Sequence, residues 1–363
     1  MTDQDYMAHA LALAARGLGR TWPNPAVGCI IVSQNRIVGR GHTQAGGRPH
    51  AEVMALTQAA AAATGATAYV TLEPCAHHGH TPPCANALIA AGVARVVTAL
   101  TDPDPRVSGK GHQMLRNAGI AVTENILSLE ATTLNAGFLK RVTQGLPFVT
   151  LKLATTIDGR IATQSGESRW ITGPAARRST HAMRLTHDAV MVGSGTARAD
   201  NPDLTARDLG AQHQPIRIVI DSRLSHSPQS RLGQTARQTP VWLCHTDAAS
   251  DAARTAWLAA GAILIECPAT PDGHVNLSQA LHRLAEKGLT RILCEGGAQL
   301  AAALIRDDLA DELAHFTAGA LIGSEGTAAI GPLGLAALAD APRLTRLSVT
   351  PIGADTLTRW AFR

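Results

Sequence analysis

The sequence is poor in aromatic residues and has no long apolar run. Aromatic residues make up 3% of the 363 residues, which argues against a surface of stacked aromatic platforms for single-stranded nucleic acid. No apolar stretch approaches the roughly 18–20 residues of a membrane span. The first six residues, MTDQDY, are polar and acidic and resemble no signal peptide. We therefore expect a cytoplasmic protein that binds neither a membrane nor nucleic acid.

An excess of one charge is also missing. Lys and Arg total 32 and Asp and Glu total 28, which gives a net charge of +4. Residues 1–145 carry 11 basic and 8 acidic residues, and the remainder carries 21 and 20. Neither half has the dense basic field of a nucleic-acid binder. The mild positive bias suits a small anionic substrate.

The length and the residue pattern predict two α/β domains. At about 150 residues per domain, 363 residues make two domains the natural expectation. Strand-like and helix-like segments alternate in both halves, which is typical of α/β layers. A predicted helix over 128–143 and a predicted strand over 148–155 flank Gly145-Leu146-Pro147, whose turn residues mark a boundary. The predicted domains are 1–145 and 147–363, and the last predicted strand is 312–317.

The six cysteines fall into two groups. In a reducing compartment a chain of this length needs no disulfide framework. Cys29, Cys244, Cys267 and Cys294 lie in apolar predicted strands, so we predict buried, inert thiols there. The other two lie close together in the sequence and belong to a pattern that suggests metal binding.

That pattern is His50-Ala51-Glu52, followed by Pro74-Cys75 and then Cys84. One imidazole and two thiolates suit tetrahedral zinc, and three protein ligands leave the fourth position open for water. Zinc generates hydroxide from that water near neutral pH. Glu52, at the start of a predicted helix, can take the water's proton and deliver it to a leaving amine. The pattern is the signature of zinc nucleobase deaminases.

The spacing leaves alternatives open. Eight residues separate the two cysteines, instead of the usual two, and they include His77, His78 and His80. One of these histidines could fill the fourth position and make a closed structural site, and the residues could also hold no metal. A nucleic-acid-editing deaminase shares the motif, but it predicts a basic groove and stacking aromatics. A regulatory zinc module is disfavoured because Glu52 is retained.

Two glycine turns in the second half suggest a dinucleotide site. The segments 193–196 (GSGT) and 295–298 (EGGA) each lie between a predicted strand and a predicted helix. Such turns let backbone N–H groups approach a phosphate at a helix N-terminus. The spacing is not that of a standard Rossmann domain. Glycines also serve close strand–helix packing, so each turn alone is weak evidence.

Further motifs resemble the family of bifunctional riboflavin biosynthesis deaminase/reductases. They are the segments 22–28 (WPNPAVG), 71–84 (TLEPCAHHGHTPPC), 166–172 (GESRWIT), and 193–196 leading to Asp200-Asn201-Pro202. The long segment between the cysteines is usual in that family, and the resemblance covers essentially the whole chain. It implies an N-terminal cytidine-deaminase-like α/β/α sandwich and a C-terminal dihydrofolate-reductase-like α/β domain.

The resemblance also implies two reactions. The first is zinc-dependent hydrolytic deamination of 2,5-diamino-6-(5-phosphoribosylamino)pyrimidin-4(3H)-one. The second is NADPH-dependent reduction of the ribosyl side chain, which gives 5-amino-6-(5-phosphoribitylamino)uracil. The family commonly forms homo-oligomers, so we expect one here, with small-molecule phosphoribosyl pyrimidines as its ligands.

The resemblance carries roles to individual positions. It gives the zinc to His50, Cys75 and Cys84 and the proton transfer to Glu52. It implies NADPH contacts at Ala154, Trp170, Thr196, Asp200, Ser222, Gly297, Ala298, Gln299, Leu300, Ala301, Ala302 and Ala303. It implies substrate contacts at Asn24, Ser168, Arg184, Leu204, Arg207 and Glu295.

Several of these roles have simpler alternatives. Asn24 could be only a turn-forming residue, Trp170 ordinary packing, and Arg184 a surface ion pair. Candidate contacts for the substrate 5-phosphate are His42, His77 and Lys110. Asp104 stands where the family commonly has Asn, which puts a substrate role at that position in doubt. Lys152, together with Asp200, is a candidate polar group near the reacting ribose.

Overall fold

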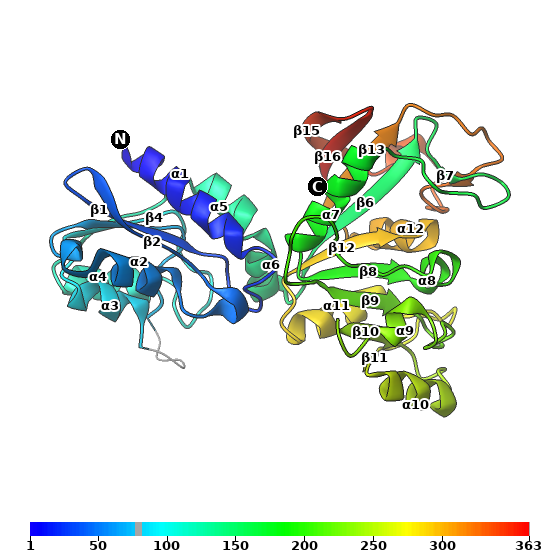
Figure 1. The fold of residues 1–363 in the computed structure, drawn as a ribbon, viewed down its shortest axis with the longest axis horizontal. Coiled ribbons are helices and arrows are strands. Elements are labelled where there is room, and N and C mark those ends of the chain that lie inside the picture. Colours follow the sequence, from blue (N-terminus) through cyan, green and yellow to red (C-terminus); the bar gives the residue numbers. More distant parts are fainter. Residues whose placement is uncertain (77–81, 363) are drawn as a thin grey trace. The chain divides into compact units, whose positions relative to one another are not determined.

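The computed structural model describes residues 1–76 and 82–362. The chain folds into two compact units, Met1–Gly145 and Leu146–Arg363, here called the N-terminal and C-terminal units (Figure 1). Gly145 ends the last helix of the N-terminal unit with a left-handed φ of 69°, a conformation that favours glycine. None of the described helices is both long and apolar enough to cross a membrane.

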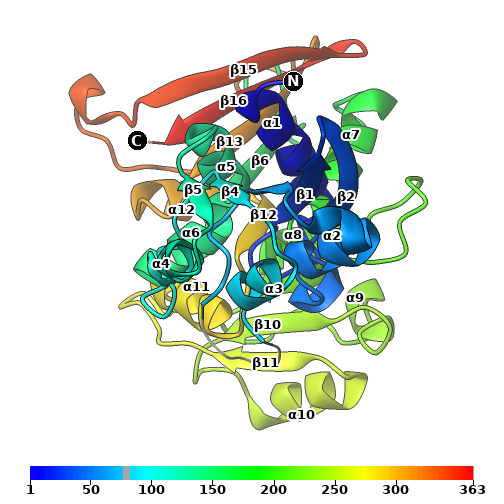
Figure 2. The same cartoon turned by 90° about the vertical axis from the view of Figure 1, so that its left-hand side faces the viewer.

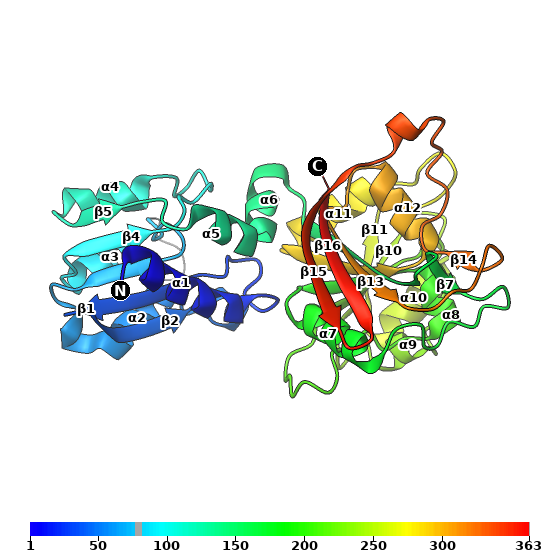
Figure 3. The same ribbon diagram turned by 90° about the horizontal axis from the view of Figure 1, so that it is seen from above.

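The N-terminal unit is built on a five-stranded sheet with the order β2-β1-β3-β4-β5 (Figure 3). Its strands are β1 (Gly28–Ser33), β2 (Arg36–His42), β3 (Thr67–Val70), β4 (Arg95–Thr98) and β5 (Ala121–Thr123). β1 runs antiparallel to both neighbours, and β3, β4 and β5 are parallel. The carboxyl ends of β3 and β4 therefore lie at one edge of the sheet.

Helices cover both faces of this sheet (Figure 1). They are α1 (Asp3–Ala14), α2 (Ala51–Ala59), α3 (Cys84–Ala90), α4 (Lys110–Asn117), α5 (Ser128–Leu134) and α6 (Ala136–Gln144). Because strand side chains alternate between faces, Ile30 and Val32 pack with α1, whereas Cys29 and Ile31 pack with α2. The predicted α/β/α sandwich is confirmed.

The predicted single helix over 128–143 is wrong, because α5 and α6 are separated at Asn135. This residue has φ −97° and ψ 15°, and its side chain is buried. Its Oδ1 accepts from the Ala26 N–H at 3.0 Å, and its Nδ2 donates to the Ala26 carbonyl at 3.0 Å. A tertiary contact with a distant loop thus replaces the helical continuation that the local sequence favours.

The C-terminal unit has a nine-stranded sheet with the order β11-β10-β9-β8-β12-β6-β13-β16-β15. All neighbours from β11 to β13 are parallel, and β16 and β15 add an antiparallel hairpin at one edge (Figure 2). The strands are β6 (Phe148–Thr156), β8 (Ala189–Gly193), β9 (Ile216–Ile220), β10 (Val241–His245), β11 (Ile263–Glu266), β12 (Arg291–Gly296), β13 (Glu312–Ala318), β15 (Leu344–Ile352) and β16 (Asp355–Phe362). The sequence prediction ended at 312–317 and missed this hairpin.

The remaining elements connect and cover these strands. The helices are α7 (Pro174–Leu185), α8 (Ser194–Asp200), α9 (Arg231–Gln234), α10 (Asp251–Ala260), α11 (Leu277–Glu286) and α12 (Ala298–Arg306). β7 (Arg160–Ala162) and β14 (Thr327–Ala328) form a separate pair. Short 3-10 turns cover Ala15–Gly17, Ala45–Gly47, Ala60–Ala63 and Leu338–Asp340. The four cysteines predicted as core thiols, at 29, 244, 267 and 294, are buried and free, as expected.

Candidate active sites

Three side chains of the N-terminal unit converge as metal donors. His50 immediately precedes α2, Cys75 follows β3, and Cys84 begins α3. His50 Nδ1 lies 3.3 Å from Cys84 Sγ and 3.8 Å from Cys75 Sγ, and all three donor atoms lie within 4.8 Å of one another. Zinc bonds of about 2.1 Å to nitrogen and 2.3 Å to sulfur require donors about 3.5–3.8 Å apart in a tetrahedron. The donor set and its spacing therefore fit zinc.

The electrostatics of this cluster also suit a metal. The Cys84 N–H donates to Cys75 Sγ at 3.2 Å. Hydrogen bonds from Cys84, together with one from His50, lower the pKa of the Cys75 thiol to about 4. This shift favours the thiolate of Cys75, the form that binds metals, whereas the hydrogen bond to Cys75 and burial raise the pKa of the Cys84 thiol. The proposed alternative ligands His77, His78 and His80 lie outside the described residues. His77 is also the candidate contact for the substrate phosphate, so that prediction stays open as well.

Glu52 lies in the first turn of α2, two residues past the histidine donor. Its side chain is 4% exposed. Burial, and secondarily the charge of Cys75, raises the pKa of this carboxyl above its usual value. A carboxyl in such surroundings exchanges protons closer to neutral pH than an exposed one.

A turn that carries Asn24 is held in place from two directions. The Asn24 N–H donates to the Thr21 carbonyl at 3.0 Å, so this residue does form a turn. A Cβ added to Gly47, whose φ is +84°, would lie 1.9 Å from Asn24 Nδ2. The turn is also tied to the core through Ala26 and Asn135. The sequence analysis missed Asn135, and its only local signal is a polar residue inside a helical pattern.

Two further candidates of this unit have partners inside the protein. Lys110 Nζ donates to the Pro105 carbonyl at 2.9 Å. Asp104 is buried and pairs with Arg106, whose Nη2 lies 2.5 Å from Asp104 Oδ2. His42 is half-buried at the end of β2, and burial lowers the pKa of its imidazole.

In the C-terminal unit the two glycine turns meet. β8 and β12 are parallel neighbours, so the turns at their carboxyl ends lie side by side, where ligands bind in open α/β sheets. A Cβ added to Gly297, whose φ is +88°, would lie 3.0 Å from Thr196 Oγ1. The helix α8 begins at Ser194, directly after Gly193, and α12 begins at Ala298, directly after Gly297, so both helices start within the predicted turns. This arrangement fits a dinucleotide phosphate.

The predicted segment 297–303 is only partly accessible. Gly297, Ala298 and Ala303 are half-buried and Gln299 is exposed, whereas Leu300, Ala301 and Ala302 face the core. A bound cofactor would therefore meet mainly the start of this segment.

The other predicted cofactor contacts lie on separate elements. Ala154 is half-buried in β6, and Asp200 ends α8, where its carbonyl accepts from Arg169 Nη2 at 2.9 Å. Ser222 follows β9, and its Oγ accepts from the Val275 N–H at 3.0 Å.

Trp170 is not ordinary core packing, because 67% of it is exposed. The Arg177 guanidinium lies 4.5 Å from the centre of its ring. A large exposed ring next to a cation offers a flat surface for a ligand.

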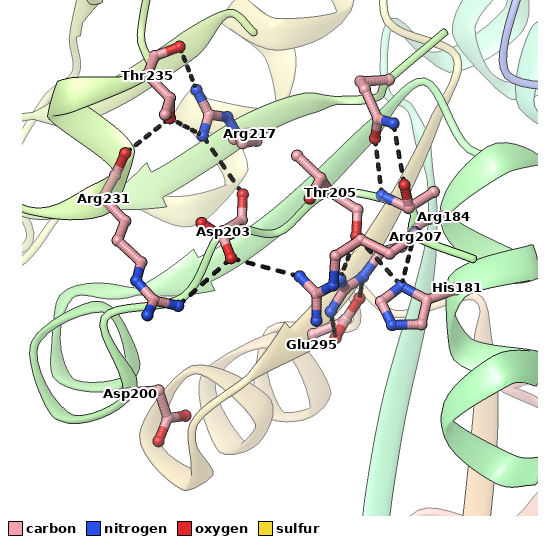
Figure 4. A network of polar contacts seen from close by, with 12 residues as sticks. His181, Arg184, Asp200, Asp203, Thr205, Arg207, Arg217, Arg231, Thr235 and Glu295 are labelled. Carbon is pink, nitrogen blue, oxygen red and sulfur yellow. Dashed lines mark hydrogen bonds and ion pairs between the residues drawn. The ribbon is translucent and has the colours of Figure 1, made fainter. Parts of the chain in front are cut away.

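Arg184 and Glu295, both predicted substrate contacts, bind each other (Figure 4). Their side chains are only 11% and 8% exposed, so the alternative of a surface ion pair is wrong. Burial opposes the charge of Glu295, but Arg184 outweighs it, and the pKa of this carboxyl is lowered. Burial lowers the pKa of the nearby Lys152, while the charge of Glu295 opposes that shift.

The loop after α8, which carries Leu204 and Arg207, is held by backbone contacts (Figure 4). Arg184 Nη1 donates to the Thr205 carbonyl at 2.7 Å. Leu204 is buried with a left-handed φ of 55°. The Arg207 guanidinium is half exposed, and the carboxylate of Asp203 lies 3.5 Å from it. The loop therefore presents Arg207 from a fixed backbone.

Two residues that support this loop were missed by the sequence analysis. Gln214 accepts from the Ala206 N–H at 2.7 Å and donates to the Ala206 carbonyl at 3.0 Å. Arg217 is buried in β9 and donates to the carbonyls of Asp203 and Thr239. Nothing in the local sequence distinguishes either residue, because their partners are distant backbone atoms. Ser168, another predicted substrate contact, is half-buried between β7 and α7.

The fold and the two sites define a bifunctional enzyme, with a zinc-type deaminase site in one unit and a dinucleotide site in the other. Residues 1–100 match the family model of the cytidine and deoxycytidylate deaminase zinc-binding region. Residues 147–358 match the RibD C-terminal domain.

Individual relatives cover nearly the whole chain. The riboflavin biosynthesis protein RibD of Escherichia coli K12 is 44% identical over 371 residues, which is 98% of each chain. That of Aquifex aeolicus is 38% identical over 353 residues, covering 97% of this chain and 96% of the relative. The solved structure of Acinetobacter baumannii RibD, form 1, has a TM-score of 0.90 and 39% identity over 99% of each chain.

A Thermotoga maritima protein has a TM-score of 0.87 and 33% identity, over 99% of each chain. It is described as a diaminohydroxyphosphoribosylaminopyrimidine deaminase/5-amino-6-(5-phosphoribosylamino)uracil reductase. The present chain belongs to the RibD family of riboflavin biosynthesis proteins. It is an enzyme with deaminase and reductase activities that uses zinc and NADPH, which confirms the expectations from the sequence.

Proposed function

We propose that the N-terminal unit, residues 1–145, deaminates 2,5-diamino-6-(5-phosphoribosylamino)pyrimidin-4(3H)-one and releases ammonia. The C-terminal unit, from residue 147 onward, then reduces the ribosyl side chain to give 5-amino-6-(5-phosphoribitylamino)uracil. The observation that carries the first step is the convergence of His50, Cys75 and Cys84 beside the buried carboxyl of Glu52. The name of the Thermotoga maritima relative supports this choice of substrates.

In the deaminase, His50, Cys75 and Cys84 would hold the zinc ion. When bound, zinc lowers the pKa of water and supplies the nucleophile near neutral pH. Glu52 takes the proton of that water and returns it to the amine that leaves, a role that suits its burial. Asn24 hydrogen-bonds the pyrimidine from its fixed turn.

In the reductase, the paired glycine turns bind the cofactor phosphates through Thr196 and Gly297. NADPH supplies the hydride. The exposed ring of Trp170 covers the cofactor, and Asp200 and Ser222 contact it from the ends of α8 and β9. The remaining proposed cofactor contacts are Ala154, Ala298, Gln299 and Ala303, while Leu300, Ala301 and Ala302 of the predicted segment 297–303 face the core.

The substrate of the reductase is held mainly by charge. The exposed guanidinium of Arg207 binds its phosphate, because arginine pairs with phosphate through two donors. The Arg184–Glu295 pair contacts its polar groups, and Ser168 and Leu204 complete the contacts. Lys152, whose pKa burial lowers, is suited to exchange a proton with the sugar.

We also propose that the chain acts in the cytoplasm as a homo-oligomer that binds no nucleic acid. β15 is an edge strand of the large sheet, and Leu347 and Val349 on it are exposed. A long exposed edge strand with apolar side chains is a natural surface for pairing with a second copy. Analytical ultracentrifugation tests this point, and a monomer at micromolar concentration would contradict it.

The central test uses the whole chain with the diamino substrate and NADPH, and follows ammonia release and loss of absorbance at 340 nm. We expect ammonia first, and NADPH oxidation only as the deaminated product forms. Removing the metal with a chelator should abolish ammonia release and leave reduction of preformed deaminated product intact. Arg207→Ala should raise the reductase KM and leave deamination unchanged. Equal loss of both activities in either experiment would contradict two independent sites.

A further inference from the structure

Glu73 is a buried carboxylate whose charge is met by backbone N–H groups. Its side chain is 3% exposed. Oε2 accepts from the N–H of Asp102 at 3.1 Å and of Gly109 at 2.9 Å. Oε1 accepts from the N–H of Gly111 at 2.8 Å and of His112 at 3.3 Å. Four donors from one segment thus converge on a single carboxylate.

Such an arrangement fixes the segment strongly. Hydrogen bonds to a charged acceptor contribute more than neutral ones, and a buried carboxylate that loses them is costly. Glu73 has no Lys or Arg among its hydrogen-bond partners in the described part of the chain. The segment 102–112 therefore stabilises the buried carboxylate of Glu73, and the carboxylate in turn holds the backbone of this segment in place.

Glu73 lies close to Cys75, one of the three proposed zinc donors. Glu73 is two residues before Cys75, and its own N–H donates to the Leu100 carbonyl at 2.8 Å. A Cβ added to Gly111 would lie 2.0 Å from the Pro74 carbonyl oxygen. The segment 102–112 is therefore pressed against the turn that carries Cys75, with no space between their backbones.

The segment also carries charged side chains. Asp104 pairs with Arg106, whose side chain is 71% exposed, and Lys110 is exposed while its Nζ contacts the Pro105 carbonyl. Two accessible cations on a fixed backbone next to the proposed zinc site suit a phosphate-bearing substrate.

We propose that Glu73 is a positioning residue of the deaminase. It holds segment 102–112 against Pro74 and Cys75, so that Arg106 and Lys110 form one wall of the phosphoribosyl-pyrimidine site. Glu73 does not touch the substrate or the metal, and it acts through the four amides. This inference rests on the deaminase function proposed above for the N-terminal unit.

The test compares Glu73→Gln with wild type in the full chain. Gln keeps the shape but removes the charge and places an amide NH₂ against backbone donors. We expect the deaminase KM to rise about tenfold or more, the change in affinity expected from weakening hydrogen bonds to a charged group, with kcat much less affected. Zinc content should stay at that of wild type. Amide exchange at Asp102, Gly109, Gly111 and His112 should accelerate.

A matched control is Glu124→Gln. Glu124 also contacts α4, with Oε2 3.2 Å from His112 Nδ1 and Oε1 accepting from Arg116. Unlike Glu73, it contacts side chains of this helix and accepts none of the four backbone hydrogen bonds that Glu73 accepts. We expect its deaminase KM to stay near wild type. If Glu73→Gln does not fold, Gly111→Ala serves instead, because its Cβ displaces the same segment while the carboxylate is intact. NADPH oxidation with deaminated product reports that the rest of each variant is folded.

The outcomes separate the two proposals. An unchanged deaminase KM in Glu73→Gln despite faster amide exchange would overturn the positioning role. Loss of zinc in proportion to loss of activity would also overturn it, because the effect would then come from Cys75. Absence of ammonia release by the wild-type chain would instead overturn the proposed function.

Discussion

Arg184 and Glu295 form a two-point ion pair between α7 and β12, with Arg184 Nε 2.5 Å from Oε1 and Nη2 2.8 Å from Oε2. The same guanidinium holds the loop of Arg207 through the Thr205 carbonyl. One buried arginine therefore links Glu295, near the carboxyl end of β12, to the loop that presents the proposed phosphate contact Arg207. Losing either partner should affect both the stability and the activity of the C-terminal unit.

The first prediction concerns this pair. Glu295→Gln should lower reductase kcat/KM and destabilise the C-terminal unit by about 3–5 kcal/mol, the usual consequence of leaving a buried charge without its partner. The double variant Arg184→Gln/Glu295→Gln should recover part of the stability but not the activity. Urea unfolding and NADPH oxidation measure the two effects. A single variant as stable as wild type would show that the pair is not buried in solution.

The second prediction concerns the meeting of the glycine turns. Gly297→Ala should weaken NADPH binding, because the new Cβ would lie 3.0 Å from Thr196 Oγ1 and the φ of +88° disfavours any side chain. Gly273→Ala is the control, since Gly273 has φ +80° and open space around it. Fluorescence titration with NADPH compares them. Equal NADPH affinities in the two variants would show that the turn at Gly297 is not part of the cofactor site.

The third prediction concerns the tie between Asn135 and Ala26. Asn135→Ala leaves the Ala26 N–H and carbonyl without their side-chain partner, at about 1–3 kcal/mol for each buried group that stays unsatisfied. We expect a less stable N-terminal unit and a higher deaminase KM, because the turn with Asn24 loses its anchor. Thermal unfolding and ammonia release test this. A normal KM in a destabilised variant would limit Asn135 to a structural role.

The fourth prediction concerns pH. Burial lowers the pKa of His187 to about 3, and its ring contacts Thr150 Oγ1 at 2.9 Å and the Met183 carbonyl at 2.7 Å. Below the unfolded value near 6.5, the unfolded chain binds a proton that the folded chain does not. This group's contribution to stability is thus lost as pH falls from about 6.5 towards 3, by up to about 1.4 kcal/mol per unit.

The side chain of the variant His187→Gln offers both a donor and an acceptor but does not titrate. The variant's free energy of unfolding should fall less steeply between pH 6 and pH 4. The difference in slope should be about 1.4 kcal/mol per pH unit, the contribution of one proton. Urea titrations of both proteins across that range give the two slopes. Identical slopes would mean that His187 is not the group responsible.

The sequence predicted those parts of the sites that are set by residues close together in the chain. The histidine, the carboxyl and the two cysteines form a spaced pattern whose chemistry is explicit, and the glycine turns follow strands that periodicity predicts. Parallel neighbours then bring the turns together, as Thr196 and Gly297 show.

Other features depend on contacts between distant residues, which no local pattern reveals. Asn135 splits a predicted helix because it binds Ala26, more than a hundred positions earlier. The β15–β16 hairpin was missed because β15 is almost wholly exposed and has no buried apolar face, so only its pairing with β16 defines it. Glu73 and Gln214 act on backbone groups, whose positions follow from the tertiary fold alone.

The most direct test of the account is Glu52→Gln, measured for zinc content, ammonia release and NADPH oxidation in one preparation. Gln cannot accept and return a proton, but it leaves the three metal donors in place. We predict wild-type zinc content, loss of ammonia release, and undiminished reduction of preformed deaminated product. Ammonia release at the wild-type rate would contradict the account.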